Sequence, residues 1–412
     1  GGVSIACSLM VSIYALAKVS GANFNPAVSF ALGMAGKMEW RTVGIYCCVQ
    51  ASAGICAAIG YSLLYGDTFN LGPTEGFGWW QAMLCELLYT FLLTFVVLNT
   101  AASKKLGGQN QFYGLAIGFV IVAGAYGPGA VSGGCFNPAV ALAIDSSSIS
   151  KGFGWCIVYT VFELLGAVLA VGAFEILRPE ERRRSLEAPA EYRPECKLVG
   201  EAIGTYMLVL TAGLNVLTES KAAAFSIAAC LMCMIYAIGD VSGGHFNPAV
   251  TVAIYSSGRN KIEPKTAGLY MGVQVLAGLL GALLYALIMG GVTFPIGPGR
   301  GFGWPGVSAA EVIYTFVLTF VVLCVATVQV NPAPELTGFI IGMCVTVGGL
   351  AIGGVSGGSL NPAVSAGLAL SDAAVNSGPI SYLPGYFAAE LLAGAAASYV
   401  FKSIHRGEYE KA

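Results

Sequence analysis

Asparagine and proline recur at four places in this chain where their side chains are unusual. The tetrapeptide Asn-Pro-Ala-Val begins at Asn25, Asn137, Asn247 and Asn361, each time inside an apolar stretch. Proline lacks an N–H and fits the first turn of a helix, and asparagine is among the best residues for capping a helix start. Each copy therefore predicts a helix start that presents an amide side chain, which can hydrogen-bond a neutral polar molecule. The motif residues are Asn25, Pro26, Ala27, Asn137, Pro138, Ala139, Asn247, Pro248, Ala249, Asn361, Pro362 and Ala363.

The helices that follow these motifs are expected to be short. About 10 apolar residues span ~15 Å, which is half of the ~30 Å hydrocarbon core of a bilayer. The glycine-rich segments 132–134 and 242–244 precede two of the motifs and predict loops that dip into the membrane. Such backbone is tolerated only where it lines a cavity or is buried in protein. Two half-helices from opposite sides would direct their positive dipole ends at one point, which favours neutral solutes and opposes cations, protons included.

The composition predicts an all-α polytopic membrane protein. The chain has 412 residues, of which 56% are hydrophobic and only 10% charged, and its mean hydropathy is +0.74. Soluble domains carry about 25% charged residues. The net charge of −2 and the lack of a basic tract argue against a nucleic-acid partner. With two histidines and no HExxH motif, we expect no catalytic residue, no metal site and no cofactor.

Internal repeats predict the arrangement of the spans. The four motifs are separated by 112, 110 and 114 residues, and Gly76-Phe-Gly-Trp79 returns 225 residues later as Gly301-Phe-Gly-Trp304. A unit of about 225 residues is therefore present twice, and each half of a unit contains three spans and one motif. Because three is odd, the second half enters the membrane from the opposite side. The fold class is two tandem units of inverted repeats, each half having three spans plus one re-entrant half-helix.

The apolar runs give the expected domain boundaries. Unit one covers 1–177, a charged linker covers 178–195, unit two covers 196–404 and a tail covers 405–412. No run in unit one corresponds to the span at 197–217, so we expect its first helix before Gly1. The expected spans lie near 3–18, 41–65, 80–102, 111–130, 152–177, 197–217, 222–239, 265–290, 307–328, 337–352 and 380–403.

Lysine and arginine are distributed unevenly between the two sides that these spans define. The side of the linker collects 17 of the 20 basic residues, and the other side keeps only Lys151, Lys221 and Arg300. Basic residues accumulate in cytosolic loops. The linker and the C-terminal tail are therefore expected to be cytosolic.

The segments "SGANFNPAV" and "SGGHFNPAVTVA", the paired motifs and six spans per unit resemble the aquaporin, or major intrinsic protein, family. The resemblance covers nearly the whole chain as two units in tandem. It implies a right-handed bundle around one pore per unit, lined by Asn25 with Asn137 and by Asn247 with Asn361. It also implies passage of water or small neutral solutes, and assembly as a dimer of tandem chains with four pores. The membrane glutamates that would brace the re-entrant loops are Glu86, Glu201 and Glu311.

The resemblance also places an outer constriction of four residues in each unit. In unit one these are Ile5, Ala125, Gly134 and Val140, and in unit two they are Ile227, Gly349, Gly358 and Val364. The family usually has arginine directly after the second motif, where this chain has Val140 and Val364. An apolar constriction without this cation predicts a wider opening that is less selective for water.

Two other functions fit the same sequence features. A secondary transporter also uses inverted repeats and broken helices, and would use ionisable residues within its spans for coupling. A closed junctional or scaffold protein of the same fold is the other alternative, since apolar constrictions can exclude water. A passive channel is favoured, because the acidic residues within the spans are interpreted as structural.

Overall fold

The computed structural model describes residues 1–182, 187–331 and 333–410. These residues form helices and loops without a strand, and ten of their helices are long and apolar enough to cross a membrane. The all-α fold class is therefore confirmed. The chain divides into two compact units, Gly1–Ala190 and Glu191–Ala412. Residues 183–186 of the expected linker and 411–412 of the expected tail lie outside the described residues.

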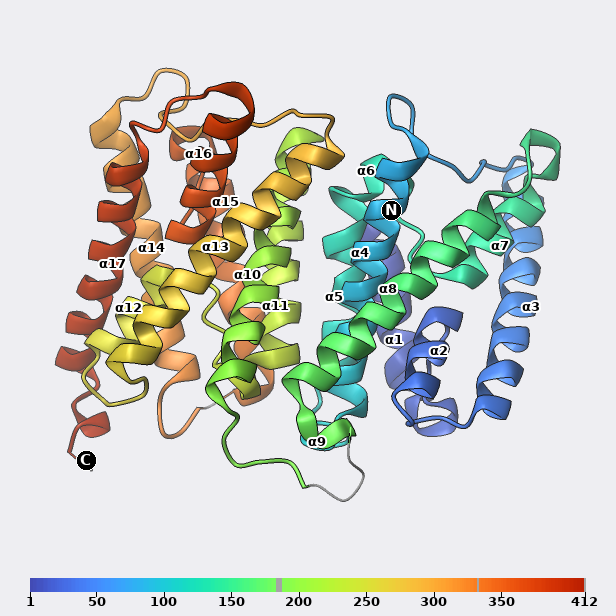
Figure 1. Cartoon of the computed structure of the whole chain (residues 1–412), viewed down its shortest axis with the longest axis horizontal. Helices are drawn as coiled ribbons and strands as arrows, with labels where there is room; N and C mark the ends of the chain where they lie inside the picture. Colours follow the sequence, from blue (N-terminus) through green and yellow to red (C-terminus); the bar gives the residue numbers. More distant parts are fainter. Residues whose placement is uncertain (183–186, 332, 411–412) are drawn as a thin grey trace. The chain divides into compact units, whose positions relative to one another are not determined.

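Unit two contains both halves of the predicted inverted repeat. Its short helices α12 and α16 enter from opposite ends of the unit and lie among the long helices (Figure 1). The helices are α10 (Pro194–Leu217), α11 (Ala223–Ser242), α12 (Pro248–Ser256), α13 (Pro264–Ile288), α14 (Trp304–Ala326), α15 (Thr337–Ser356), α16 (Pro362–Asn376) and α17 (Leu383–Ile404), with single turns η3 (Pro334–Leu336) and η4 (Arg406–Glu408).

Unit one repeats this order from the second long helix onward, with α2 and α7 as its half-helices. Its elements are α1 (Gly2–Ser20), α2 (Pro26–Met34), α3 (Trp40–Tyr65), α4 (Trp79–Val97), the π-helical η1 (Leu98–Ala102), α5 (Tyr113–Tyr126), α6 (Gly129–Ser132), α7 (Pro138–Ser147), η2 (Ile149–Lys151), α8 (Trp155–Leu177) and α9 (Pro179–Arg182).

The prediction of one helix near 111–130 is wrong. Helix α5 ends at Tyr126 and the short α6 begins at Gly129, whereas the corresponding α15 of unit two is continuous from Thr337 to Ser356. Unit one has Gly127 and Pro128 where unit two has Ala351 and Ile352. Proline removes a helix hydrogen bond and crowds the residue before it, and this explains the interruption.

The half-helices differ from the expected length of about 10 residues in one case. Helices α2, α7 and α12 have 9, 10 and 9 residues, but α16 has 15. The serines at 146–148 coincide with the end of α7, and serine competes with the helix for backbone hydrogen bonds. Helix α16 continues through Ala373 and Ala374 and ends at Asn376, and the next residue, Ser377, adopts a left-handed conformation with φ 56°.

The beginning of the expected charged linker is not solvated. Arg178 is completely buried, and its Nε donates a hydrogen bond to Asn99 Oδ1 at 2.8 Å. Glu181 is also buried, and it pairs with Lys37 at 2.7 Å. Residues 178–181 therefore pack against unit one rather than separating from it.

Close helix crossings in unit one depend on glycine. A Cβ atom at Gly166 of α8 would lie 2.3 Å from the carbonyl oxygen of Leu87 in α4, whereas a Cβ at Gly172 of the same helix would meet nothing within 4 Å. We expect Gly166→Ala to destabilise the protein by about 1–3 kcal/mol through overpacking. Gly172→Ala is expected to be neutral or slightly stabilising. Thermal unfolding of the two variants side by side tests this, and equal unfolding temperatures would contradict it.

Candidate functional site

Each motif asparagine caps a half-helix, as its sequence predicts. The side-chain Oδ1 of Asn25 accepts a hydrogen bond from the N–H of Ala27, and Asn137 does the same with Ala139. In unit two, Asn247 and Asn361 accept from the second residue of their helices at 2.8 and 2.9 Å. In all four, proline follows as the first helical residue.

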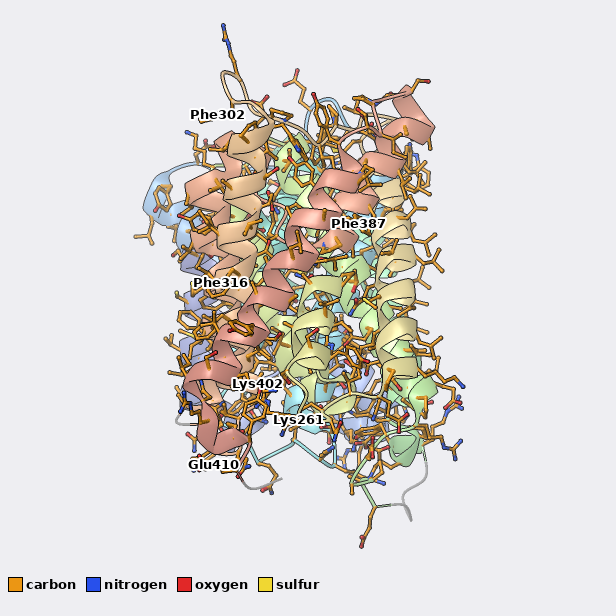
Figure 2. All side chains as sticks on the ribbon, turned by 90° about the vertical axis from the view of Figure 1, so that its left-hand side faces the viewer. Lys261, Phe302, Phe316, Phe387, Lys402 and Glu410 are labelled. Atoms are coloured by element: carbon orange, nitrogen blue, oxygen red, sulfur yellow. The ribbon has the colours of Figure 1, made fainter. Side chains whose placement is uncertain are left out.

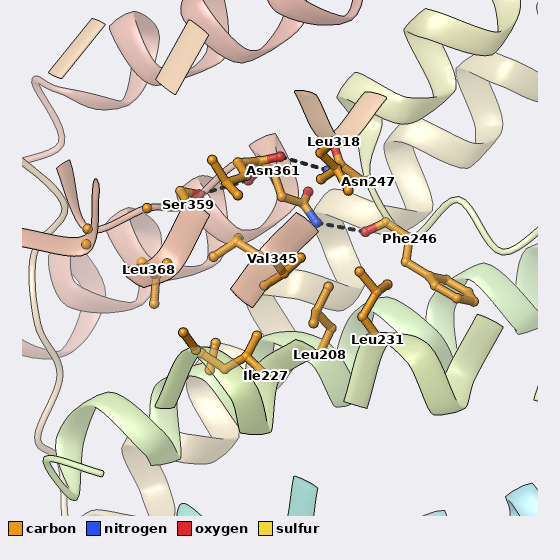
Figure 3. A pocket seen from close by; sticks show the side chains of 18 of the residues that line it. Leu208, Ile227, Leu231, Phe246, Asn247, Leu318, Val345, Ser359, Asn361 and Leu368 are labelled. Carbon is orange, nitrogen blue, oxygen red and sulfur yellow. Dashed lines mark hydrogen bonds between the residues drawn. The ribbon is translucent and has the colours of Figure 1, made fainter. Parts of the chain in front are cut away.

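The side-chain amides also join the two half-helices of each unit. Asn361 Nδ2 donates to the carbonyl oxygen of Phe246 at 2.9 Å, and Asn247 Nδ2 donates to that of Leu360 at 2.8 Å. Figure 3 shows the first of these bonds beside the cavity of unit two. In unit one, Asn25 donates to Phe136 and Asn137 to Phe24 in the same reciprocal way. Since each NH₂ group carries two hydrogens, one remains for another acceptor.

The residue before each asparagine adopts a strained backbone conformation. Phe24, Phe136, Phe246 and Leu360 have φ values of 53°, 52°, 49° and 56°, in the left-handed region that bulky residues rarely occupy. The carbonyl groups of these four residues are the acceptors of the reciprocal bonds. Sequence reasoning missed their role, because nothing in the sequence marks Phe or Leu for this conformation.

Buried glutamates hold the loops that precede the motifs. In unit two, Glu201 of α10 accepts hydrogen bonds from Ser242 Oγ, from the backbone N–H groups of His245 and Phe246, and from Gln274 Nε2, at 2.7–3.0 Å. All four donors converge on one carboxylate that has no exposed surface. A buried charge requires such partners.

The second motif of each unit is held in a similar way by two glutamates. Glu311 accepts from Ser356 Oγ and from the N–H groups of Ser359 and Leu360, while Glu390 accepts from the N–H of Asn361. In unit one, Glu86 takes the place of Glu311, and Glu163 accepts from the N–H of Asn137 at 2.8 Å. Glu163 and Glu390 recur 227 residues apart in the sequence, each followed by two leucines, and this repeat could have identified them. Nothing comparable in the sequence marks Gln274.

The first motif of unit one has the same donors without a carboxylate. Gln50 Nε2 bonds to Ser29 Oγ at 3.0 Å, and Ser20 Oγ lies 3.5 Å from the carbonyl of Leu16. No carboxylate among the described residues accepts from the N–H groups of Asn23 and Phe24. Phe24 is half-buried, whereas Phe246 is completely buried against Gly204 of α10.

Unit two contains a cavity of about 330 Å³ at the meeting point of its half-helices. Asn247 and Asn361 line it together with mainly apolar side chains. Figure 3 shows Leu208, Ile227 and Val345 around this space. Of the described residues that line it, none is Asp, Glu, Lys or Arg. The cavity therefore offers amide and backbone hydrogen bonds in an uncharged, largely apolar wall.

All four residues assigned to the constriction of unit two line this one cavity: Ile227, Gly349, Gly358 and Val364. In unit one, Ile5 and Val140 are 59% and 40% exposed, and Ala125 and Gly134 are half-buried. Ala125 lies next to Gly2, just as Gly349 lies next to Ala224. His245 also lines the cavity of unit two, where its Nδ1 bonds to Thr251 Oγ1 at 3.0 Å.

Three regions of the chain, residues 2–174, 120–213 and 196–401, match the family model described as Major intrinsic protein. The chain is 32% identical over 193 residues to "Probable aquaporin AqpM" of Archaeoglobus fulgidus, covering 44% of this chain and 74% of that protein. It is 33% identical over 181 residues to "Aquaporin NIP1-1" of Zea mays, covering 43% and 63%, so the chain spans just under two thirds of this relative's length. The solved aquaglyceroporin from Plasmodium falciparum is 19% identical with a TM-score of 0.45, covering 52% of this chain and 98% of that structure.

Proposed function

Because the chain belongs to the major intrinsic protein family, we propose that it is a passive membrane channel for water and small uncharged solutes. The observation that carries this proposal is the cavity of unit two, which has a volume of about 330 Å³. Asn247 and Asn361 both line it, and the rest of its wall is largely apolar. In this proposal, solutes pass through the channel between the two half-helices. One amide hydrogen of each asparagine is free to bind them.

Charge selectivity follows from the same geometry. The N-terminal ends of α12 and α16 both face the asparagine pair. Helix N-termini carry a partial positive charge, so a cation at this point meets two repulsive dipoles and an uncharged wall. Neutral molecules that accept hydrogen bonds meet no such barrier.

The residues of the constriction support the passage of solutes larger than water. Val364 occupies the position at which the family usually has arginine, and Gly349 and Gly358 add no side-chain bulk. An arginine there would contribute a fixed charge and five N–H donors. Without it, urea- and glycerol-sized molecules pass the apolar opening, and Val140 has the same role in unit one.

A flux assay distinguishes this channel from the other candidate functions. In liposomes that contain the purified chain, solute flux should rise linearly with concentration and leave a trapped pH dye unchanged. Saturating flux that follows a proton gradient would favour a secondary transporter. Absence of any solute or water flux above that of empty liposomes would favour a closed scaffold protein.

We also propose that residues 178–195, of which 178–181 pack against unit one, link units 1–177 and 196–404 on the cytosolic side, where the tail 405–412 also lies. Figure 2 supports this for unit two, since Lys261, Lys402 and Glu410 lie at one end and Phe302 lies at the opposite end. Lysines gather on the cytosolic side of membrane proteins. Protease cleavage of the 187–193 segment in sealed vesicles of known orientation tests it.

The proposed assembly is a dimer of tandem chains with four pores. Family members usually assemble as four single units, and two units per chain reach that number with two chains. A mass in detergent equal to one chain would contradict this assembly.

A further inference from the structure

Two carboxyl groups meet behind the second motif of each unit. The pair is Glu86 with Glu163 in unit one and Glu311 with Glu390 in unit two, and all four residues have no exposed surface. In unit one the two carboxyl groups lie within hydrogen-bonding reach of each other, and in unit two the charge of Glu311 acts directly on the carboxyl group of Glu390. Neither pair takes part in the ion pairs of the described residues. Two adjacent buried carboxylates without a cation would repel each other strongly.

One oxygen in each pair receives no hydrogen bond. Glu163 Oε2 and Glu390 Oε2 are buried and have no partner among the described residues. The other oxygen of each carboxyl group accepts hydrogen bonds. Glu163 Oε1 accepts from Asn137 N, and Glu390 Oε1 accepts from Asn361 N and Ser365 Oγ. The same atom is therefore left over in both units.

The first motif of unit two shows what satisfies such a position. There the partner of Glu201 is Gln274, whose Nε2 donates to Glu201 Oε2 at 2.8 Å. Gln274 lies on α13, the last long helix of the first half, and Glu390 lies on α17, the last long helix of the second half. Glu390 thus occupies the position of an amide that acts as a donor. A glutamate can donate in the same way only when it is protonated.

The other titratable groups around the pairs already have acceptors. The hydroxyl of Tyr159 donates to Ser132 O, and that of Tyr386 donates to Ser356 O. The thiol of Cys135 lies within hydrogen-bonding reach of Glu163 as well as of Asn137 O, from which its Sγ is 3.4 Å away, and Ser359 hydrogen-bonds to Glu390 in unit two. Cys85 is the remaining titratable neighbour of the pair in unit one, and it is buried. Among the described residues, none of these hydrogen bonds reaches Glu163 Oε2 or Glu390 Oε2.

We propose that Glu163 and Glu390 are protonated in the folded protein, and that each donates a hydrogen bond from Oε2 to Glu86 or Glu311. Each unit then holds one buried proton behind its second half-helix. Glu163 and Glu390 are positioning residues, because their other oxygen holds the backbone of Asn137 or Asn361. A protonated carboxyl group in a buried site acts as a neutral donor, so each pair carries a single negative charge.

Removal of this proton has a predictable consequence. At high pH both carboxyl groups of a pair become charged close to each other, while both are still required to hold the loop. Folding stability is therefore expected to fall as the pH rises, since the folded state binds a proton that the unfolded state releases. Glutamine at 163 and 390 keeps the donor without the proton, so this part of the pH dependence should disappear.

Infrared spectroscopy of the full chain at neutral pH tests the proposal. The parent protein is expected to show the C=O stretching band of protonated carboxyl groups. Glu163→Gln and Glu390→Gln should each remove one of two contributions, and the double variant should remove both. The reciprocal variant Gln274→Glu converts the Glu201 pair into two carboxyl groups, so it should add a contribution.

Thermal unfolding across neutral and alkaline pH supplies the second readout. The parent should lose stability with rising pH, and the double glutamine variant should lose less. No protonated-carboxyl band in the parent, or a band unchanged in both variants, would overturn the proposal. A Na⁺-dependent stability that both glutamine variants abolish would instead indicate a bound cation and would also overturn it. Neither readout depends on conduction, so the outcome is separate from that of the proposed channel function.

Discussion

Val364→Arg is expected to reduce glycerol and urea permeability through unit two about tenfold or more, which corresponds to a barrier increase of ~1.4 kcal/mol. Val364 lines the cavity together with Ile227 and Gly349. Arginine is longer than valine, permanently charged and rich in N–H donors. It fills the opening that admits solutes larger than water, while water can still pass and hydrogen-bond to it.

The measurement is liposome swelling with water, urea and glycerol for the parent, for Val364→Arg and for Val140→Arg combined with Val364→Arg. The control Val364→Leu adds apolar volume without charge or donors, and its effect on glycerol should be smaller. Size-exclusion chromatography verifies that each variant is folded. A double arginine variant with the parent's glycerol permeability would show that these positions do not form the constriction.

Glu201→Leu is expected to destabilise unit two by at least about 4 kcal/mol, taking about 1 kcal/mol for each buried donor left without an acceptor. The four donors are Ser242 Oγ, the N–H groups of His245 and Phe246, and Gln274 Nε2. A loss of this size approaches the whole stability of many domains, about 5–15 kcal/mol. The loop that carries Asn247 would then lose its position, and with it the pore.

The matched control is Glu195→Leu, which makes the same chemical change in the first turn of α10 at an exposed position. It should leave the unfolding temperature nearly unchanged. Glu201→Gln keeps an acceptor oxygen and should lie between the two. If Glu201→Leu unfolds at the same temperature as Glu195→Leu, the carboxylate does not brace the loop.

Most of the fold could be predicted from the repeats in the sequence. Asparagine and proline have strong local preferences, so the starts of all four half-helices followed from the motif alone. The break in unit one after Tyr126 was also encoded locally, by Gly127 and Pro128, but the apolar run hid it. Helix α7 ends among the serines at 146–148, whereas α16 continues through Ala373 and Ala374, a difference in weak propensities that a hydropathy pattern does not register.

The site was harder to predict from the sequence, because it depends on contacts between distant segments. Asn361 and Phe246 are 115 residues apart, and only the folded chain shows that the amide of one meets the carbonyl of the other. Arg178 was interpreted as part of a charged linker, and nothing in its sequence neighbourhood indicates that its side chain is buried. Its burial depends on Asn99, 79 residues away in a π-helical turn.

The most direct test of the proposed function is the ratio of glycerol to water permeability of the parent chain in liposomes, with urea as a second solute. A channel with an apolar constriction at Val140 and Val364 should pass water, urea and glycerol above the background of empty liposomes. Water permeability without any passage of urea or glycerol would contradict the account.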